Sequence, residues 1–221
     1  MAILEHLFSP LTLRGVTVRN RILSTGHQTF LARKGKITDE LIAYHEARAK
    51  GGVGMIILES ARFHESSICD LPEIHITHDE HIDGFRKLAD AVHRHGAKVI
   101  GQLSHSGRCS HMRCDGVRGV VYAPSAVPDH RFHTMPRTMS TQMVDDVIVA
   151  LGQSAKRMAD ADLDGVEILA SHGLLFAQFI NEKTNQRDDK YGGSFENRMR
   201  ALSDALRAAR QAFGPDRVVG I

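Results

Sequence analysis

The chain has 221 residues and a net charge of +2, with 42% hydrophobic and 24% charged residues, which is the balance of an ordinary globular protein. Acidic and basic residues are mixed throughout and Trp is absent, which argues against a basic stripe or a stacking platform for nucleic acid. No apolar run approaches the roughly 20 residues of a membrane span, and the N-terminus has no secretory signal pattern. The three cysteines give no disulfide framework. We therefore expect a cytoplasmic protein without nucleic-acid or membrane partners.

Strand-like apolar runs alternate with helical patterns along the whole chain. Thr38 is a candidate N-cap for the first helix, Gly51 and Gly52 end it, and Gly96 ends the second. A long loop is expected over residues 104–141. The predicted strands cover residues 21–25, 53–58, 97–103, 165–169 and 217–221, and the predicted helices cover 38–50, 79–95, 144–161 and 195–213. This alternation predicts a parallel sheet covered by helices.

Two architectures share this alternation, the doubly wound sheet and the (β/α)8 barrel. The doubly wound sheet expects a Gly-rich phosphate turn after the first strand, and Gly26-His27-Gln28-Thr29 contains no G-x-G-x-x-G. Polar residues instead recur where successive strands end, which is where barrel enzymes place their chemistry. These residues are Gly26, His27, Glu59, Ser60, Gln102, His105 and His172. We expect an α/β protein with a (β/α)8 TIM barrel, of which about the first five strands are present, in one domain over residues 1–221.

Several stretches match the motifs of a known family, and they occur in the family's order. They are Leu7–Pro10, Val18–Ile22, Tyr44–Gly54, Gln102–Arg108, Ala123–Ser125, Asp164–Ile168, His172-Gly173, Gln178-Phe179 and Asn185–Arg198. On these residues the chain resembles the NADH:flavin oxidoreductase / Old Yellow Enzyme family. The turn Thr25–Gln28 and the segment Asn185–Arg187 are most similar to its trimethylamine dehydrogenase / 2,4-dienoyl-CoA reductase branch. Complete members of that branch carry an iron–sulfur cluster and a second dinucleotide-binding region, which would lie outside this chain.

The resemblance implies a flavin cofactor, FMN, held at the ends of the strands. A flavin needs backbone against one face of its ring and hydrogen-bond donors at its pyrimidine edge. Gln28 stands where some relatives carry a Cys that links to the flavin, and an amide cannot form that thioether, so the FMN would be non-covalent. By resemblance, the residues that contact it are Thr25, Gly26, His27 and Gln28 in the first turn, Ser60 on the second strand and Gln102 on the third.

The resemblance also implies a substrate site after the fourth strand, with His172 as the catalytic residue. In the family, two residues three apart hydrogen-bond the substrate over the flavin, and a Tyr two residues later donates a proton. Here the positions of this set are Leu169, His172 and Leu174, so His172 alone keeps a polar side chain. Reduction of an activated alkene needs an electrophilic clamp and a proton source. The two leucines therefore favour other substrates, such as amines.

The predicted function is hydride transfer between FMN and a small organic substrate, with NAD(P)H or the substrate itself as the reductant. One alternative is an oxidative amine dehydrogenase or demethylase rather than an ene or dienoyl reductase. Another is a catalytically degenerate barrel that serves as a binding or assembly module, a role that Leu169 and Leu174 make conceivable. An aldolase-like barrel would want a Lys at a strand end for a Schiff base, and none of the predicted strand ends has one.

A rival motif lies in the long loop, where His105, Cys109, His111 and Cys114 have side chains that suit zinc. Their spacing matches no standard knuckle, and His105 already belongs to a family motif. We therefore expect no metal site and predict that both cysteines are free thiols. The charged, Gly-rich segment 185–198 is expected to be architectural rather than to bind substrate.

A closed barrel has eight strands in about 250 residues or more, and the family's FMN phosphate site follows its last two strands. The sequence therefore predicts that a polypeptide of these residues alone binds FMN weakly or not at all. Its first and fifth strands would be open edges, since only closure removes them. We accordingly expect a homo-oligomer, or association through those edges.

Overall fold

The computed structural model describes residues 4–69, 71–109 and 119–221. The helices are α1 (Glu5–Phe8), α2 (Asp39–Lys50), α3 (Ile82–His93), α4 (Thr141–Asp160), α5 (Leu175–Ile180) and α6 (Phe195–Phe213), with 3-10 turns η1 (Glu65–Ser67) and η2 (Asp79–His81). The strands are β1 (Leu11–Leu13), β2 (Val16–Val18), β3 (Leu23–Ser24), β4 (Met55–Arg62), β5 (Ile74–His75), β6 (Lys98–Ser104), β7 (Tyr122–Ala123), β8 (Arg137–Thr138), β9 (Gly165–Ile168) and β10 (Val218–Gly220). No helix in these described ranges combines the length and the apolar character needed to cross a bilayer.

The main sheet decides between the two candidate architectures. Its path of neighbouring strands is β3–β4–β6–β9–β10, all parallel, and the short β5 also pairs with β4. The order of the strands in the sheet thus follows their order in the chain, whereas in a doubly wound sheet the strand order reverses at a switch point. Parallel neighbours in chain order, joined through helices, are the arrangement of a (β/α)8 barrel. The barrel topology predicted from the sequence is confirmed over these five strands.

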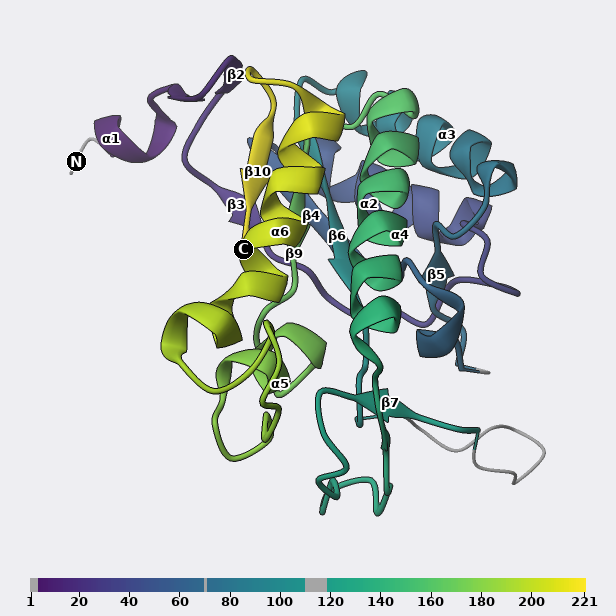
Figure 1. Ribbon diagram of the computed structural model, residues 1–221. Coiled ribbons are helices and arrows are strands. Elements are labelled where there is room, and N and C mark those ends of the chain that lie inside the picture. The colour runs from purple at the N-terminus through teal and green to yellow at the C-terminus, as the bar shows by residue number, and fades with distance from the viewer. Residues whose placement is uncertain (1–3, 70, 110–118) are drawn as a thin grey trace.

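Helices α4 and α6 lie side by side in front of the strands, and α5 and β7 lie at the end toward which the strands point (Figure 1). Gly101 in β6 allows α4 to come close, because a Cβ there would lie 2.3 Å from the sulfur of Met158. A Cβ on Gly152 of α4 would lie 3.1 Å from the Cβ of Ala208 in α6. These small residues bring the helices together over one continuous apolar core.

Side-chain caps fix where three helices begin. The hydroxyls of Thr38, Ser140 and Ser194 each accept a hydrogen bond from the backbone N–H three residues later. This satisfies one of the backbone donors that the first turn of a helix leaves free. Because Ser140 is the cap, α4 begins at Thr141, three residues before the predicted start. The predicted starts of α2 and α6 agree with the structure.

The short strands β1, β2, β5, β7 and β8 were missed by the sequence patterns. A hairpin of β1 and β2 precedes the sheet, and the backbone N–H of Gly15 at its turn donates to the carbonyl of Asp216 at 2.7 Å. The long loop predicted over residues 104–141 contains the parallel pair β7–β8. The first strand of the sheet is only two residues long, so Thr25, predicted to end the strand, already lies in the following turn. Strands of two or three residues are too short for a period of two to be recognised.

The motif around Arg19 and Asn20 stabilises the amino ends of the strands. The Arg19 guanidinium donates to the carbonyls of Ala49, Val53 and His95, at distances of 2.6 to 3.2 Å. Asn20 donates to the carbonyl of Gly52 at 2.8 Å and accepts from the backbone N–H of Ile22 at 3.1 Å. These contacts join the segment before β3 to the residues that connect α2 to β4 and to the end of α3. The role of this motif is therefore architectural, at the end of the sheet opposite the predicted site.

Candidate active site

The carboxyl ends of four neighbouring strands bring the predicted cofactor residues together. Ser60 of β4, Gln102 of β6 and Glu167 of β9 are direct register partners and form one row across the sheet. The alternate residue of β6, Gly101, faces α4, so the row lies on the sheet face away from that helix. Parallel strands end at the same edge, and this row is therefore the floor of the candidate site.

Gly26, in the turn after β3, packs directly on Gln102. A Cβ at position 26 would lie 3.0 Å from Gln102 Nε2 and 3.0 Å from the carbonyl oxygen of Leu58. The second contact is with backbone, which cannot move aside without disturbing β4. Glycine lets the turn pass this close to the strand ends without displacing them, which fits the residue type of the motif here.

Glu59 is a buried carboxylate that holds the rest of this turn. Its side chain accepts hydrogen bonds from the backbone N–H of Thr29 at 3.1 Å, from the Thr29 hydroxyl and from Gln28 Nε2 at 3.4 Å. Gln28 Oε1 in turn accepts from the Ser60 hydroxyl at 3.3 Å. Glu59 is 1% exposed, and burial raises the pKa of its carboxyl group. Hydrogen bonds with Glu59 and Ser60 therefore hold the turn after β3 against β4.

Gln102 has a carboxylate partner of its own. Its Nε2 donates to Glu167 Oε1 at 2.6 Å, across the register pair that joins β6 to β9. The two predicted cofactor glutamines, Gln28 and Gln102, therefore each donate to a glutamate on the sheet. The sequence placed Glu59 among the polar residues at strand ends and Glu167 within a family motif, but it assigned neither of them a partner. A charged residue inside an otherwise apolar strand was the available signal for both.

Thr25 and His27 are exposed at the mouth of the turn. The His27 ring stacks toward Tyr44 of α2, with ring centroids 6.4 Å apart and planes at 19°. Both side chains are accessible to solvent. Their roles as cofactor contacts remain predictions.

His172 lies in a tight turn after β9. The backbone at His172 has φ of +58°, a left-handed conformation that is strained for a residue with a side chain. Its Nδ1 is 2.6 Å from the hydroxyl of Ser171, which orients the exposed imidazole. The backbone N–H of Leu174 closes the turn on the carbonyl of Ser171 at 3.1 Å. Ser171 was not singled out in the sequence.

The segment with the predicted substrate residues lies beside the carboxyl end of β6. The backbone N–H of Leu169 donates to the carbonyl of Leu103 at 2.9 Å, and that of Leu175 donates to the carbonyl of His105 at 3.0 Å. The segment that carries Leu169, His172 and Leu174 is therefore fixed beside the strand that carries Gln102. Leu169 and Leu174 are half-buried, and their apolar side chains cannot hydrogen-bond a substrate.

Buried ionic and imidazole groups form the wall beyond the row. Arg62 makes a two-point ion pair with Glu73, at 2.8 and 2.7 Å, and donates to Ser104 at 3.1 Å. His105 accepts from the backbone N–H of Gly107 at 3.0 Å through Nδ1, so its Nε2 carries the proton and donates to Ser66 at 2.8 Å. Burial holds the pKa of His105 well below its usual value, so this ring is neutral.

Two members of the rival zinc motif have other partners in the structure. His105 has the two hydrogen bonds given above, and the Cys109 thiol donates to Asp129 and to the carbonyl of Gly173, each at 3.1 Å. Cys109 is a free thiol, as predicted, and it is buried. Cys69 is also a buried free thiol. The other two members, His111 and Cys114, lie outside the described residues.

The segment 185–198 is held by backbone contacts. Asn185 donates to the carbonyls of Phe179 and Tyr191 at 2.7 and 2.8 Å. Arg187 pairs with Asp189 at 2.5 Å and also donates to the carbonyls of Pro124 and Met139. Arg198 donates to the carbonyl of Ile180 at 2.9 Å. Because these polar groups are engaged with the protein itself, the structure agrees with the architectural interpretation of this segment.

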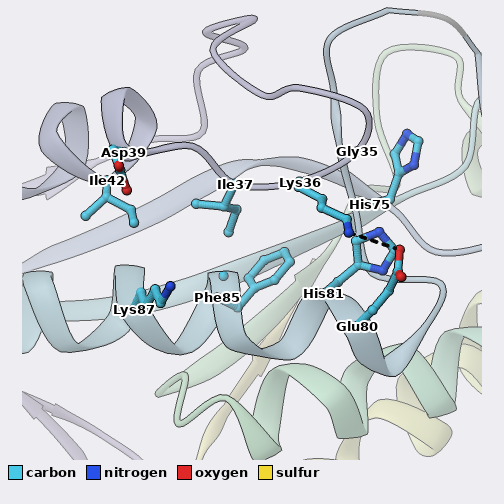
Figure 2. Close-up of a pocket in the computed structure, with 11 residues that line it drawn as sticks. Gly35, Lys36, Ile37, Asp39, Ile42, His75, Glu80, His81, Phe85 and Lys87 are labelled. Carbon is cyan, nitrogen blue, oxygen red and sulfur yellow. Dashed lines mark ion pairs between the residues drawn. The ribbon is translucent and has the colours of Figure 1, made fainter.

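A separate pocket of about 180 Å³ lies between the loop after β3 and the start of α3 (Figure 2). Lys36 and Glu80 face each other at its rim, with Nζ and Oε1 3.6 Å apart, and both are largely exposed. Gly35, His75, His81 and Phe85 are among its other lining residues. None of the predicted cofactor or substrate residues lines it, so this pocket is distinct from the candidate site.

Comparison with known proteins identifies the family. The model of the NADH:flavin oxidoreductase / NADH oxidase family matches residues 6–221. The chain is 38% identical to an NADH oxidase of Thermoanaerobacter brockii, over 96% of this chain and 33% of that protein. It is 37% identical to an N,N-dimethylglycine/sarcosine dehydrogenase of Chromohalobacter salexigens, over 98% of this chain and 32% of that protein. It therefore spans about a third of the length of these two relatives.

A solved structure of a 2-naphthoyl-CoA reductase in complex with 2-naphthoyl-CoA has the same fold, with a TM-score of 0.91 at 29% identity. The match covers 98% of this chain and 35% of that one. Of the family motifs noted in the sequence, those with Gln102 and His172 lie at or after the carboxyl ends of strands, and the one with Arg19 and Asn20 lies at the amino end of the sheet. This chain belongs to the NADH:flavin oxidoreductase / NADH oxidase family.

Proposed function

We propose that the protein is an FMN-dependent oxidoreductase that transfers hydride between FMN and a small organic substrate, with NAD(P)H or the substrate as the reductant. The observation that carries the proposal is the convergence of Gly26, Ser60 and Gln102 at the carboxyl edge of parallel strands. Family membership supports it, and so do the names of the relatives, an NADH oxidase and a dehydrogenase.

The residues at this edge fit a flavin. The pyrimidine edge of the ring alternates hydrogen-bond acceptors and a donor, and the site offers a carboxamide, hydroxyls and backbone N–H groups. Gly26 keeps the turn close to the strand ends, so the backbone of residues 25–28 is available to one face of a planar ring. Gln28 provides no nucleophile, so the cofactor is proposed to be non-covalent. The proposed contacts are Thr25, Gly26, His27, Gln28, Ser60 and Gln102.

When bound, FMN would supply the redox chemistry of hydride transfer between a reductant and an acceptor. The protein's own residues bind and orient. Gln102 hydrogen-bonds the pyrimidine edge, and His172 binds the substrate, with the Ser171 hydroxyl holding its Nδ1. His172 is thereby positioned to hydrogen-bond the substrate and to move a proton through Nε2.

A second candidate is the oxidation of a small amine. It is favoured by Leu169 and Leu174, which remove the hydrogen-bonding partner and the proton donor that alkene reduction needs. The relative named N,N-dimethylglycine/sarcosine dehydrogenase supports testing this substrate class, and the reductase with bound 2-naphthoyl-CoA supports testing enoyl thioesters.

The experiment is anaerobic flavin reduction in the natural protein that contains these residues. We expect the purified protein to be yellow, to release FMN on denaturation, and to lose its visible flavin absorbance on addition of NADH, NADPH or a secondary or tertiary amine. Reoxidation by an enoyl thioester would identify a reductase, and reduction by an amine alone would identify the second candidate. A colourless protein would contradict the proposed function. FMN that none of these compounds reduces would favour the non-catalytic binding module.

We further propose that residues 1–221 belong to one FMN-binding barrel domain and that the protein works in the cytoplasm as a homo-oligomer. The free thiols of Cys69 and Cys109 support a reducing compartment. Sedimentation of the natural protein tests the oligomer, and a stable monomer at micromolar concentration would contradict it.

A further inference from the structure

The site contains two glutamines and two glutamates that pair in the same way. Gln28 donates to Glu59 and Gln102 donates to Glu167, in each case through Nε2 to a carboxylate oxygen. In both bonds the carboxylate accepts, so the NH2 group of each carboxamide faces its glutamate. A carboxamide is planar, and fixing its nitrogen also fixes where its oxygen points.

The two pairs differ in what they leave for a ligand. Gln28 donates to Glu59 at 3.4 Å and accepts from Ser60 at 3.3 Å, so both ends of its amide are engaged within the protein. Gln102 is held through its nitrogen by one short bond of 2.6 Å. Because the carboxamide is planar, this bond also fixes the directions in which the second N–H and Oε1 of Gln102 point.

We propose that Glu167 is a positioning residue, which fixes the carboxamide of Gln102 so that it presents a defined donor and acceptor to the pyrimidine edge of FMN. The inference deepens the proposed function and rests on it. In this role Glu167 acts through Gln102, whose amide nitrogen it holds.

The geometry of the row supports this role. Gln102 and Glu167 are register partners on adjacent strands, so their backbones are held together by the sheet itself. Gly26 packs against the same nitrogen from the first turn, where a Cβ would lie 3.0 Å from it. The carboxamide is therefore confined by β9 through hydrogen bonding and by the first turn through packing.

The energetic reason is preorganisation. A glutamine side chain in water has several rotamers, and its amide exchanges donor and acceptor by turning through half a circle. Ordering it when a ligand arrives reduces affinity, whereas an amide already ordered avoids that cost. Hydrogen bonds to charged groups are stronger than those between neutral groups, which makes a carboxylate an effective anchor.

The first test is the substitution Glu167→Gln in the natural flavin-containing protein. A neutral carboxamide can donate as well as accept, so Gln102 would no longer be held in one orientation. We expect FMN affinity to fall by about tenfold or more, since a charge-assisted bond is lost. We also expect the visible absorption bands of the residual bound flavin to shift, because the hydrogen bonds at its pyrimidine edge change.

The second test exchanges the pair, in the double variant Gln102→Glu with Glu167→Gln. This variant keeps one carboxylate and one carboxamide between β6 and β9, so a bond that only joins the strands would be restored. It places a carboxylate, which has no N–H, against the ring. We expect the melting temperature of the FMN-free protein to return to that of the wild type while FMN affinity stays low.

Each outcome decides the question. Equal FMN affinity and an identical spectrum in Glu167→Gln would overturn the positioning role, and so would recovery of FMN affinity in the exchanged pair. If Glu167→Gln does not fold, the exchanged pair tests the inference alone, and wild-type affinity there would overturn it. Absence of FMN from the wild-type protein would overturn the proposed function, and with it this inference, whereas unchanged binding in the variants would overturn the inference only.

Discussion

His45 in α2 is a buried imidazole whose protonation should destabilise the protein in acid. It is 2% exposed, and neither ring nitrogen has a hydrogen-bond partner in the described ranges. The ring lies edge-on to Tyr44, with centroids 5.1 Å apart. Burial, reinforced by the nearby Arg48 guanidinium, lowers the pKa of His45 from 6.5 to about 4.

The sign and size of the effect follow from this pKa. Between pH 6.5 and 4 the unfolded chain binds a proton at His45 that the folded protein does not, so the free energy of unfolding decreases as the pH falls. Above pH 6.5 the ring is neutral in both states and the effect is absent. Below pH 4 both states are protonated and the loss is constant, at about 3 kcal/mol, since each pKa unit corresponds to about 1.4 kcal/mol.

The assay is urea denaturation of wild type and His45→Leu at pH 7.5 and at pH 4.5. Leucine is close to histidine in volume and has no titratable group, and every other ionisable group is common to the two proteins. The wild type should therefore lose about 2 to 3 kcal/mol more than His45→Leu between these two values of pH. At pH 4.5 the variant is expected to be the more stable protein.

A result in which wild type and His45→Leu lose the same stability between pH 7.5 and 4.5 would refute the reasoning. It would mean that the His45 ring is solvated or hydrogen-bonded when charged. The pKa of His45 measured by NMR is an independent check, and a value near 6.5 would refute the reasoning as well.

Three further predictions concern the candidate site and the wall beside it. Gly26→Ala should weaken FMN binding by about tenfold, because the added Cβ crowds Gln102, and fluorescence titration with FMN would measure this. Glu73→Gln leaves the buried Arg62 guanidinium without its counter-charge and should lower the free energy of unfolding by about 3 kcal/mol, measured by urea denaturation; a change under about 1 kcal/mol would contradict it. His172→Ala should reduce kcat/KM by about a hundredfold with FMN affinity unchanged, in steady-state assays beside an FMN titration, and a change in affinity alone would contradict a substrate role.

Local patterns explain why much of the fold was predictable. The helix caps Thr38 and Ser194 act on backbone groups within three residues, so the starts of α2 and α6 were readable. Ser140 is a cap of the same kind, and overlooking it displaced the predicted start of α4. The short strands β1, β2, β5, β7 and β8 were missed because they are stabilised by pairing and not by their own composition.

The candidate site was likewise predictable only in part. Gly26, Gln102 and His172 were recognised from motifs, and the structure brings Gly26 onto Gln102 and fixes the His172 turn beside β6. The pairing of Gln28 with Glu59 and of Gln102 with Glu167 was not predicted. Glu59 lies 31 residues from Gln28 in sequence, and Glu167 lies 65 residues from Gln102. No local pattern connects residues at such separations.

The sequence by itself determined the alternation of strands and helices, the family and the residue types at the strand ends, because periodicity, capping and motif are properties of short segments. The tertiary structure alone decided which side chains meet. Parallel register places Glu167 beside Gln102, and helix packing leaves His45 without a hydrogen-bond partner among the residues that the structure describes. Hydrogen bonding and desolvation depend on neighbours in space, and those neighbours exist only once the strands have been brought together in the sheet.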